Sequence, residues 1–227
     1  MRISVVIPAR NEEAYLQSCL RALAAQTRPP DEVVVVDNGS MDRTGTIAAA
    51  LGARVVICPT PGVALARQAG LEAATGDWVA TTDADSRPVA GWLEALEAQM
   101  AGSVALYGPL RMFGLPWWQE ELTEVGYGVF LKLMALLGQP NLAAANMAFD
   151  RAVALEVGGY PAVEAREDVL LGLKLKPKGR VRYVRDALVR TSSRRVQAGW
   201  GRFFAQQLKN LSGNPEGYFA GGGGKES

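Results

Sequence analysis

The chain has 227 residues, of which 48% are hydrophobic, and its 24 basic and 23 acidic side chains give a formal net charge of +1. This length fits one large domain, or one domain with an appended lobe, and it can bury a sizeable core. The absence of histidine excludes histidine-ligated zinc sites and every histidine-based catalytic triad. The two cysteines, Cys19 and Cys58, form no disulfide framework and indicate small apolar residues in a reducing compartment.

No targeting or membrane-spanning segment is apparent. The apolar run at residues 3–7 is too short for a signal peptide and ends at Pro8. The apolar stretch at residues 125–137 contains Lys132 and is too short to span a bilayer. We therefore expect the protein in the cytoplasm.

The first half of the chain alternates buried strands with amphipathic helices. Short, mostly apolar runs rich in β-branched residues predict strands at residues 3–7, 33–36, 55–57 and 78–82. Apolar residues at helical spacing predict helices that follow Asn11 as an N-cap, contain Ile47 and Leu51, and cover residues 62–74. This alternation predicts βαβ units with right-handed crossovers in a mostly parallel sheet flanked by helices.

Polar clusters follow three of these strands. Arg10 and Glu12 follow the first, Asp37 follows the second, and Asp83 and Asp85 follow the fourth. Parallel sheets bind ligands beyond the carboxyl ends of their strands, so these clusters belong to one edge. The two carboxylates of Asp83-Ala84-Asp85 suit a hard-oxygen site, in which one binds Mg²⁺ or Mn²⁺ and the other a sugar or ribose hydroxyl. A solvated surface turn is the alternative for this tripeptide by itself.

The regular alternation ends near residue 110. Before that point we expect a helix at residues 89–100 and a strand at 104–107. Beyond it we expect a smaller irregular and helical lobe, which contains Trp117, Trp118 and a long helix that reaches residue 137. For the tryptophans we favour a place in the core over stacking on an acceptor or lining a lid. For the helix at residues 125–137 we favour the core over an acceptor wall or a membrane-facing surface.

The remaining elements are shorter. Residues 141–149, with Asn146 in the middle, form a strand or loop. A short helix ends at Gly158 and Gly159, where a left-handed cap is expected. A helix begins at Glu167 and Asp168, and a late strand covers residues 181–184.

Positive charge is concentrated in residues 169–212, which hold eleven lysines and arginines and one acid. This asymmetry indicates an anionic partner, with a solvated basic surface as the alternative. Residues 196–211 predict a basic amphipathic helix that could lie on an anionic membrane surface at its inner face. No nucleic-acid recognition motif accompanies the charge, so no nucleic acid is expected. A flexible tail is expected at residues 220–227.

Several motifs in order resemble those of family 2 glycosyltransferases, which are inverting enzymes of the GT-A fold that use nucleotide sugars. The resemblance covers residues 3–195. The motifs read V-V-I-P-A-R-N-E-E at 5–13, V-D-N-G-S at 36–40, A-R-Q-A-G at 66–70, D-A-D at 83–85, N-M-A-F at 146–149, G-G-Y at 158–160 and E-D at 167–168. Each motif is weak by itself, whereas their order and spacing together are specific.

The resemblance implies a role for each matched residue. Pro8, Ala9, Arg10 and Glu12 would cradle the nucleotide base and ribose, and Asp37 would hydrogen-bond the base edge. Arg67 would approach the diphosphate or hold the metal-binding loop. In the D-x-D, Asp83 would bind ribose or sugar hydroxyls and Asp85 the metal, with Ala84 between them at the donor. Asp168 would be the catalytic base, and Glu167 would orient it or the acceptor.

The sequence departs from the family pattern in two places. Many relatives carry a histidine near the late strand, where this chain reads V-R-T-S-S at residues 189–193. The Q-x-x-R-W motif of processive synthases is absent, which favours transfer of a single sugar. Arg194 and Arg195 could contact phosphate instead, with an exposed surface role equally open.

The resemblance therefore implies an inverting, metal-assisted hexosyltransferase acting in the synthesis of cell-envelope polysaccharide. The donor would be a UDP-sugar, with GDP- and dTDP-sugars open, the cation Mn²⁺ or Mg²⁺, and the acceptor a sugar or a lipid-linked sugar. Residues 1–219 would form one domain, with a donor half at 1–110 and an acceptor half at 111–219. The alternatives are a non-catalytic nucleotide-binding module at a membrane surface and, less favoured, a sugar nucleotidyltransferase. A nucleotidyltransferase would need a glycine-rich phosphate loop after the first strand, where this chain reads P-A-R-N-E-E at residues 8–13.

Overall fold

A computed structural model describes residues 1–136 and 142–194 of the chain. Its larger sheet has seven strands in the order β3-β2-β1-β4-β8-β6-β9. These strands are β1 (Ile3–Ala9), β2 (Glu32–Asp37), β3 (Arg54–Ile57), β4 (Trp78–Thr81), β6 (Ala105–Tyr107), β8 (Met147–Asp150) and β9 (Val181–Tyr183). All neighbours are parallel except β8, which runs antiparallel to both β4 and β6. The mostly parallel α/β sheet expected from the sequence is confirmed.

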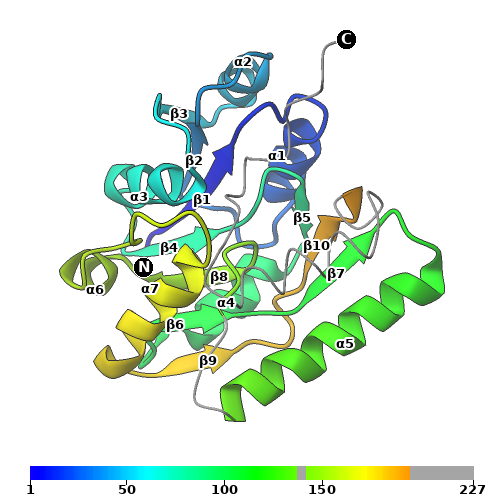
Figure 1. The fold of residues 1–227 in the computed structure, drawn as a ribbon, viewed down its shortest axis with the longest axis vertical. Helices are drawn as coiled ribbons and strands as arrows, with labels where there is room; N and C mark the ends of the chain where they lie inside the picture. The colour runs from blue at the N-terminus through cyan, green and yellow to red at the C-terminus, as the bar shows by residue number, and fades with distance from the viewer. Residues whose placement is uncertain (137–141, 195–227) are drawn as a thin grey trace.

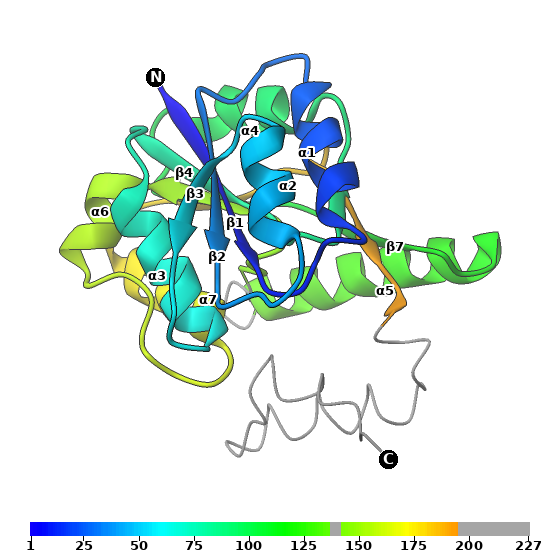
Figure 2. The same ribbon diagram turned by 90° about the horizontal axis from the view of Figure 1, so that it is seen from above.

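Helices cover both faces of this sheet (Figures 1 and 2). One face packs against α1 (Leu16–Ala24), α2 (Thr44–Ala50) and α4 (Trp92–Met100). The other packs against α3 (Val63–Ala73), α6 (Arg151–Glu156) and α7 (Glu167–Leu175), which a short 3-10 helix at Lys176–Lys178 extends. Side chains of β1 alternate between the two layers: Ile3, Val5 and Ile7 enter the first and Val6 the second. A strand buried on both faces reads as one continuous apolar run, as β1 does.

A second sheet has three strands in the order β5-β10-β7. They are β5 (Ser86–Pro88), β7 (Leu110–Phe113) and β10 (Val189–Ser192). The twenty-residue helix α5 (Trp117–Leu136) runs alongside β7 (Figure 1). The sequence predicted neither β5 nor β10, because each is short and pairs with a segment far away in the chain.

The structure corrects the expectation for Trp117 and Trp118. Their side chains are 78% and 53% exposed, so their assignment to the core is wrong. The helix that follows them is mixed, because Val125 and Val129 are also exposed whereas Leu131 is buried. A run of apolar residues without alternation does not reveal which side of a helix has a packing partner.

The structure tests two expectations about helix ends, the N-cap at Asn11 and the left-handed cap at Gly158 and Gly159. The helix expected from Asn11 begins five residues later, at Leu16, and Asn11 has a left-handed φ of +54°. The left-handed cap at Gly158 and Gly159 is confirmed, with φ of +83° and +60°. The left-handed φ at residue 159 favours glycine, and a Cβ there would also lie 2.2 Å from Oε1 of Gln68, whose side chain would have to move.

Other expectations are not settled by the fold. The division of the chain into two halves at residue 110 stays a prediction. The amphipathic helix at residues 196–211 and the tail at 220–227 lie outside the described residues. Among the helices that are described, none has the length and apolar character needed to cross a membrane.

Candidate active site

The polar clusters predicted from the sequence lie at one edge of the larger sheet. Strand β1 is parallel to both β2 and β4, with Ala9 opposite Asp37 and Val6 opposite Thr81. Arg10, Asp37 and Asp83 therefore leave the sheet on the same side. Pro8 and Ala9 are buried at the end of β1, and Ala84 packs its methyl group into the core. Any contact of Ala84 with a ligand would therefore be made by its backbone.

The loop after β1 is joined to the loop after β2. The backbone N–H of Asn11 donates to Oγ of Ser40 at 3.0 Å, and the N–H of Glu12 donates to Oγ1 of Thr44 at 2.8 Å. In return, Oδ1 of Asn11 accepts a hydrogen bond from the N–H of Met41 at 2.8 Å. These bonds take the place of the helical turn expected here and hold the backbone of Glu12 at the sheet edge.

Asp37 and Asn38 organise the turn that follows β2. Oδ1 of Asp37 accepts a hydrogen bond from the N–H of Ser40 at 2.9 Å. A Cβ at Gly45 would lie 2.8 Å from Oδ2 of Asp37, so the glycine leaves room for this carboxylate. The buried Asn38 donates to the carbonyl oxygens of Cys58 and Thr60, at 2.9 and 2.7 Å. Sequence reasoning did not assign Asn38 this positioning role.

Arg67 joins the D-x-D to the distant acidic pair. Its side chain is 3% exposed, with Nη2 3.0 Å from Oδ1 of Asp83 and Nε 3.0 Å from Oε1 of Glu167. Glu167 lies 100 residues further along the chain. Helix α3 comes close to the sheet at Gly70, where a Cβ would lie 2.3 Å from Cγ1 of Val6. Arg67 thus contacts the D-x-D loop through Asp83, and the two roles expected for it stay predictions.

Asp168 lies in the first turn of α7 beside Glu167. Its Oδ2 accepts a hydrogen bond from the N–H of Ala144 at 2.9 Å, and its Oδ1 accepts one from Val169 at 2.7 Å. Burial raises the pKa of the Asp168 carboxyl, while Arg67 acts in the opposite direction. Burial also raises the pKa of Glu167, again opposed by Arg67. A carboxylate with a raised pKa is a stronger proton acceptor, as a general base requires.

Asp85 has a different arginine partner. Nε of Arg194, two residues after β10, lies 3.0 Å from Oδ2 of Asp85. The same guanidinium binds Glu12, with Nη1 donating to Oε2 at 2.9 Å and Nη2 donating to Oε1. It also lies over the ring of Tyr15, 4.6 Å from the centroid. The sequence suggested a phosphate contact or an exposed surface role for Arg194 and did not predict that it joins Glu12 to Asp85.

The D-x-D carries carboxylate oxygens of the kind that Mg²⁺ and Mn²⁺ bind, and in this structure Asp83 is paired with Arg67 and Asp85 with Arg194. Such ions take one or two carboxylates and fill the other positions with water and phosphate oxygens. Asp85 supplies one hard oxygen site at the sheet edge. Within residues 1–136 and 142–194, no three histidine, cysteine, aspartate or glutamate side chains are grouped to enclose a metal. A cation here would therefore depend on ligand oxygens from the diphosphate.

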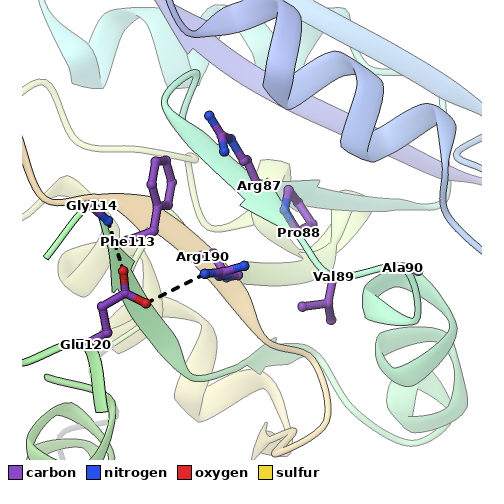
Figure 3. Close-up of a pocket in the computed structure, with 8 residues that line it drawn as sticks. All are labelled: Arg87, Pro88, Val89, Ala90, Phe113, Gly114, Glu120 and Arg190. Carbon is purple, nitrogen blue, oxygen red and sulfur yellow. Dashed lines mark hydrogen bonds and ion pairs between the residues drawn. The ribbon is translucent and has the colours of Figure 1, made fainter. Parts of the chain in front are cut away.

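A pocket of about 480 Å³ lies on the small sheet and is lined by none of these residues (Figure 3). Figure 3 shows Glu120 between the N–H of Gly114 and the guanidinium of Arg190, while Arg87 lies near Phe113. Its lining residues are Arg87, Pro88, Val89, Ala90, Phe113, Gly114, Glu120 and Arg190. None of them was predicted as a site residue, because the strands that bring them together were not recognised.

Comparisons with known proteins now decide the family. The model of the family described as glycosyl transferase family 2 matches residues 4–157. The chain belongs to glycosyl transferase family 2. An uncharacterised glycosyltransferase of Mycobacterium tuberculosis is 37% identical over 168 residues, which cover 70% of this chain and 75% of that protein. The chain is therefore a glycosyltransferase, as the motifs implied.

Solved structures of other glycosyltransferases share its fold. Glucosyl-3-phosphoglycerate synthase from M. tuberculosis, in complex with Mn²⁺, UDP and phosphoglyceric acid, superposes with a TM-score of 0.68 at 24% identity. The match covers 97% of this chain and 80% of that one. Staphylococcus aureus TarS 1–349 in complex with UDP gives a TM-score of 0.68 at 22% identity, covering 85% of this chain and 60% of that one. At these identities the likeness concerns the fold, and the chain spans less than two thirds of the TarS fragment.

Proposed function

We propose that this chain transfers one sugar from a nucleoside-diphosphate sugar to an acceptor hydroxyl, with inversion at the anomeric carbon. The observation that carries the proposal is the contact of Arg67 with both Asp83 and Glu167. It brings the D-x-D and the acidic pair of α7 into one site, although they are far apart in the chain. A single displacement needs these two parts: one that holds the donor and one that activates the acceptor.

The donor would lie along the edge formed by β1, β2 and β4. Asp37 would bind the base, the turn of Pro8, Ala9, Arg10 and Glu12 would surround base and ribose, and Asp83 would bind ribose or sugar hydroxyls. UDP is the favoured nucleotide, because structures of the same fold are known in complex with UDP. GDP and dTDP are the alternatives, since no residue here is committed to one base.

Asp168 would act as the base that removes the proton of the acceptor hydroxyl. Its two oxygens are oriented by the N–H groups of Ala144 and Val169, and burial raises its pKa. Glu167 is fixed by Arg67 and would orient the base or the acceptor. One base is sufficient for inversion, because no covalent intermediate has to be formed and broken.

Asp85 would hold the divalent cation, Mn²⁺ or Mg²⁺, together with oxygens of the diphosphate. When bound, such an ion neutralises the negative charge that develops on the departing diphosphate. Arg67 keeps Asp83 in place beside it. The acceptor would be a sugar or a lipid-linked sugar of the cell envelope, and a membrane contact through residues 196–211 belongs to the same proposal.

The test is release of nucleoside diphosphate from a panel of UDP-, GDP- and dTDP-sugars in the presence of Mn²⁺. We expect one nucleotide class to be turned over, by slow hydrolysis when no acceptor is present. Proton NMR of the first product then reports stereochemistry, and an α-linked donor should give a β anomer. An α anomer would contradict inversion, and nucleotide binding without any release would favour the non-catalytic module.

A further inference from the structure

Arg194 places a positive charge at the carboxylate that would otherwise receive a metal ion. Nε of its guanidinium is 3.0 Å from Oδ2 of Asp85, while both Nη atoms bind the carboxylate of Glu12. These three residues come from the loop after β1, the D-x-D after β4 and the segment after β10. The guanidinium of Arg194 thus joins the segment after β10 to the loop after β1 and to the D-x-D after β4.

This cation has a fixed charge and a fixed orientation. A guanidinium stays protonated in proteins, and that of Arg194 is held by the carboxylates of Glu12 and Asp85. The planar fork makes two bonds to one carboxylate, and the Tyr15 ring lies 4.6 Å from the guanidinium carbon. The strand pairing of β10 with β5 aligns this segment, with the N–H of Ser192 donating to the carbonyl of Asp85 at 3.2 Å.

Two carboxylates, those of Glu12 and Asp85, surround the guanidinium of Arg194. Glu12 and Asp85 carry two negative charges against its one, so a diphosphate approaching them would be repelled if the arginine were absent. Three of its five N–H groups make the contacts to Glu12 and Asp85, and a guanidinium suits phosphate oxygens as well as carboxylates. Because its Nε contacts Oδ2 of Asp85, the guanidinium also occupies a position that a metal ion bound to this carboxylate would need.

We propose that Arg194 is a donor-binding residue that stands in for the divalent cation at Asp85, so that the nucleoside diphosphate binds with only weak dependence on metal. This inference rests on the proposed function and refines its donor site. A divalent ion that binds Asp85 has to displace Nε of Arg194. Loss of Arg194 should therefore weaken metal-free nucleotide binding and strengthen metal binding at Asp85.

The experiment is calorimetric titration of UDP into the intact chain, once with EDTA and once with Mn²⁺. Inorganic pyrophosphate is titrated in parallel, because it tests the diphosphate contact whichever base the enzyme prefers. The variants are Arg194→Gln, which removes the charge, and Arg194→Lys, which keeps the charge but loses the fork. Lys178→Ala is the control for a lost positive charge, since Lys178 of the 3-10 helix forms an exposed ion pair with Glu156 of α6.

For the wild type we expect affinities in EDTA and in Mn²⁺ that differ by less than about tenfold. Arg194→Gln should lose about tenfold or more in EDTA and recover when Mn²⁺ is added, with Arg194→Lys between the two. Electron paramagnetic resonance of Mn²⁺ without nucleotide should show tighter metal binding by Arg194→Gln than by the wild type. Lys178→Ala should behave as the wild type throughout.

Two results would overturn the proposal, and they can be told apart. If the wild type binds UDP and pyrophosphate only with Mn²⁺, and Arg194→Gln is unchanged, Arg194 does not stand in for the cation, while the proposed function remains. If neither ligand binds under any condition, the donor site itself is wrong. Thermal melts of each variant establish that it is folded, and Arg194→Lys provides the comparison if Arg194→Gln is not.

Discussion

The edge of the seven-stranded sheet and the small three-stranded sheet hold their charged side chains differently. At the edge, Arg67 is 3% exposed and lies between two carboxylates that are 16% and 6% exposed. On the small sheet, Arg190 is 48% exposed and is 3.7 Å from its partner Glu120. Buried ion pairs are costly to break, whereas exposed pairs contribute little to stability. The edge is therefore a fixed polar arrangement, and the small sheet offers an adaptable surface.

Substitution of the two arginines should give the largest contrast. Arg67→Ala leaves Asp83 and Glu167 without this partner, and we expect it to lower the free energy of unfolding by about 3–5 kcal/mol. Arg190→Ala, on the small sheet, should change it by no more than about 1 kcal/mol. Urea unfolding followed by circular dichroism measures both. Equal losses for the two variants would contradict the contrast drawn between these regions.

Glycines in the two regions should respond in opposite directions. In Gly70→Ala on α3, the new Cβ would lie 2.3 Å from Cγ1 of Val6, and such overpacking should destabilise the protein by about 1–3 kcal/mol. In Gly126→Ala on α5, the new Cβ meets no atom within 4 Å, and the better helix propensity should stabilise it by about 0.5–1 kcal/mol. Thermal unfolding of both variants gives the signs. A gain for Gly70→Ala would mean that α3 is not packed closely on β1.

The pH dependence of transfer should report the acidic pair in the first turn of α7. Burial raises the pKa of both Asp168 and Glu167. Transfer requires the ionised base, so the rate should fall about tenfold per unit as the pH drops below the raised pKa. The acid limb of the rate profile should lie above the range of an ordinary carboxyl. A limb near pH 4 would contradict the burial of this pair.

The raised pKa values also make stability depend on pH, but here low pH is the favourable side, whereas transfer is faster at high pH. The contribution of these carboxyls is fully present below their unfolded-state pKa and is lost as the pH rises through the folded-state value. Asp168→Asn should flatten this part of the stability profile. Urea midpoints measured between pH 4 and pH 8 for the variant and the wild type give the comparison. Identical profiles would mean that Asp168 ionises in the folded protein as it does in the unfolded chain.

The smallest effect is expected on the exposed side of α5. Trp117 is 78% exposed, and its replacement by serine should change stability by no more than about 0.5 kcal/mol. Trp92 in α4 is fully buried, so Trp92→Ala should lower the free energy of unfolding by about 3–5 kcal/mol. Thermal melts distinguish the two. A large loss for Trp117→Ser would show that this surface is packed in the folded protein.

The contrast also explains how much the sequence could predict. Strands β1, β2 and β4 are continuous apolar runs joined by nearby helices, so their pattern predicted the sheet and the edge where Asp37, Asp83 and Asp85 lie. The small sheet joins Ser86 to Thr191, a pairing between distant short segments with no periodic signal. The contacts of Arg67 and Arg194 could not be predicted from the sequence for the same reason. Both arise from tertiary packing, which local spacing does not specify.

The central claim is that the acidic pair joined to the D-x-D by Arg67 carries out transfer. The most direct test measures nucleotide binding and donor turnover on one preparation of Asp168→Asn, with the exposed Asp186→Asn as control. We predict unchanged nucleotide affinity and a turnover about 10²–10⁴ times slower for Asp168→Asn, and no change for Asp186→Asn. Turnover by Asp168→Asn at the wild-type rate would contradict the account, because the proton acceptor would then lie elsewhere.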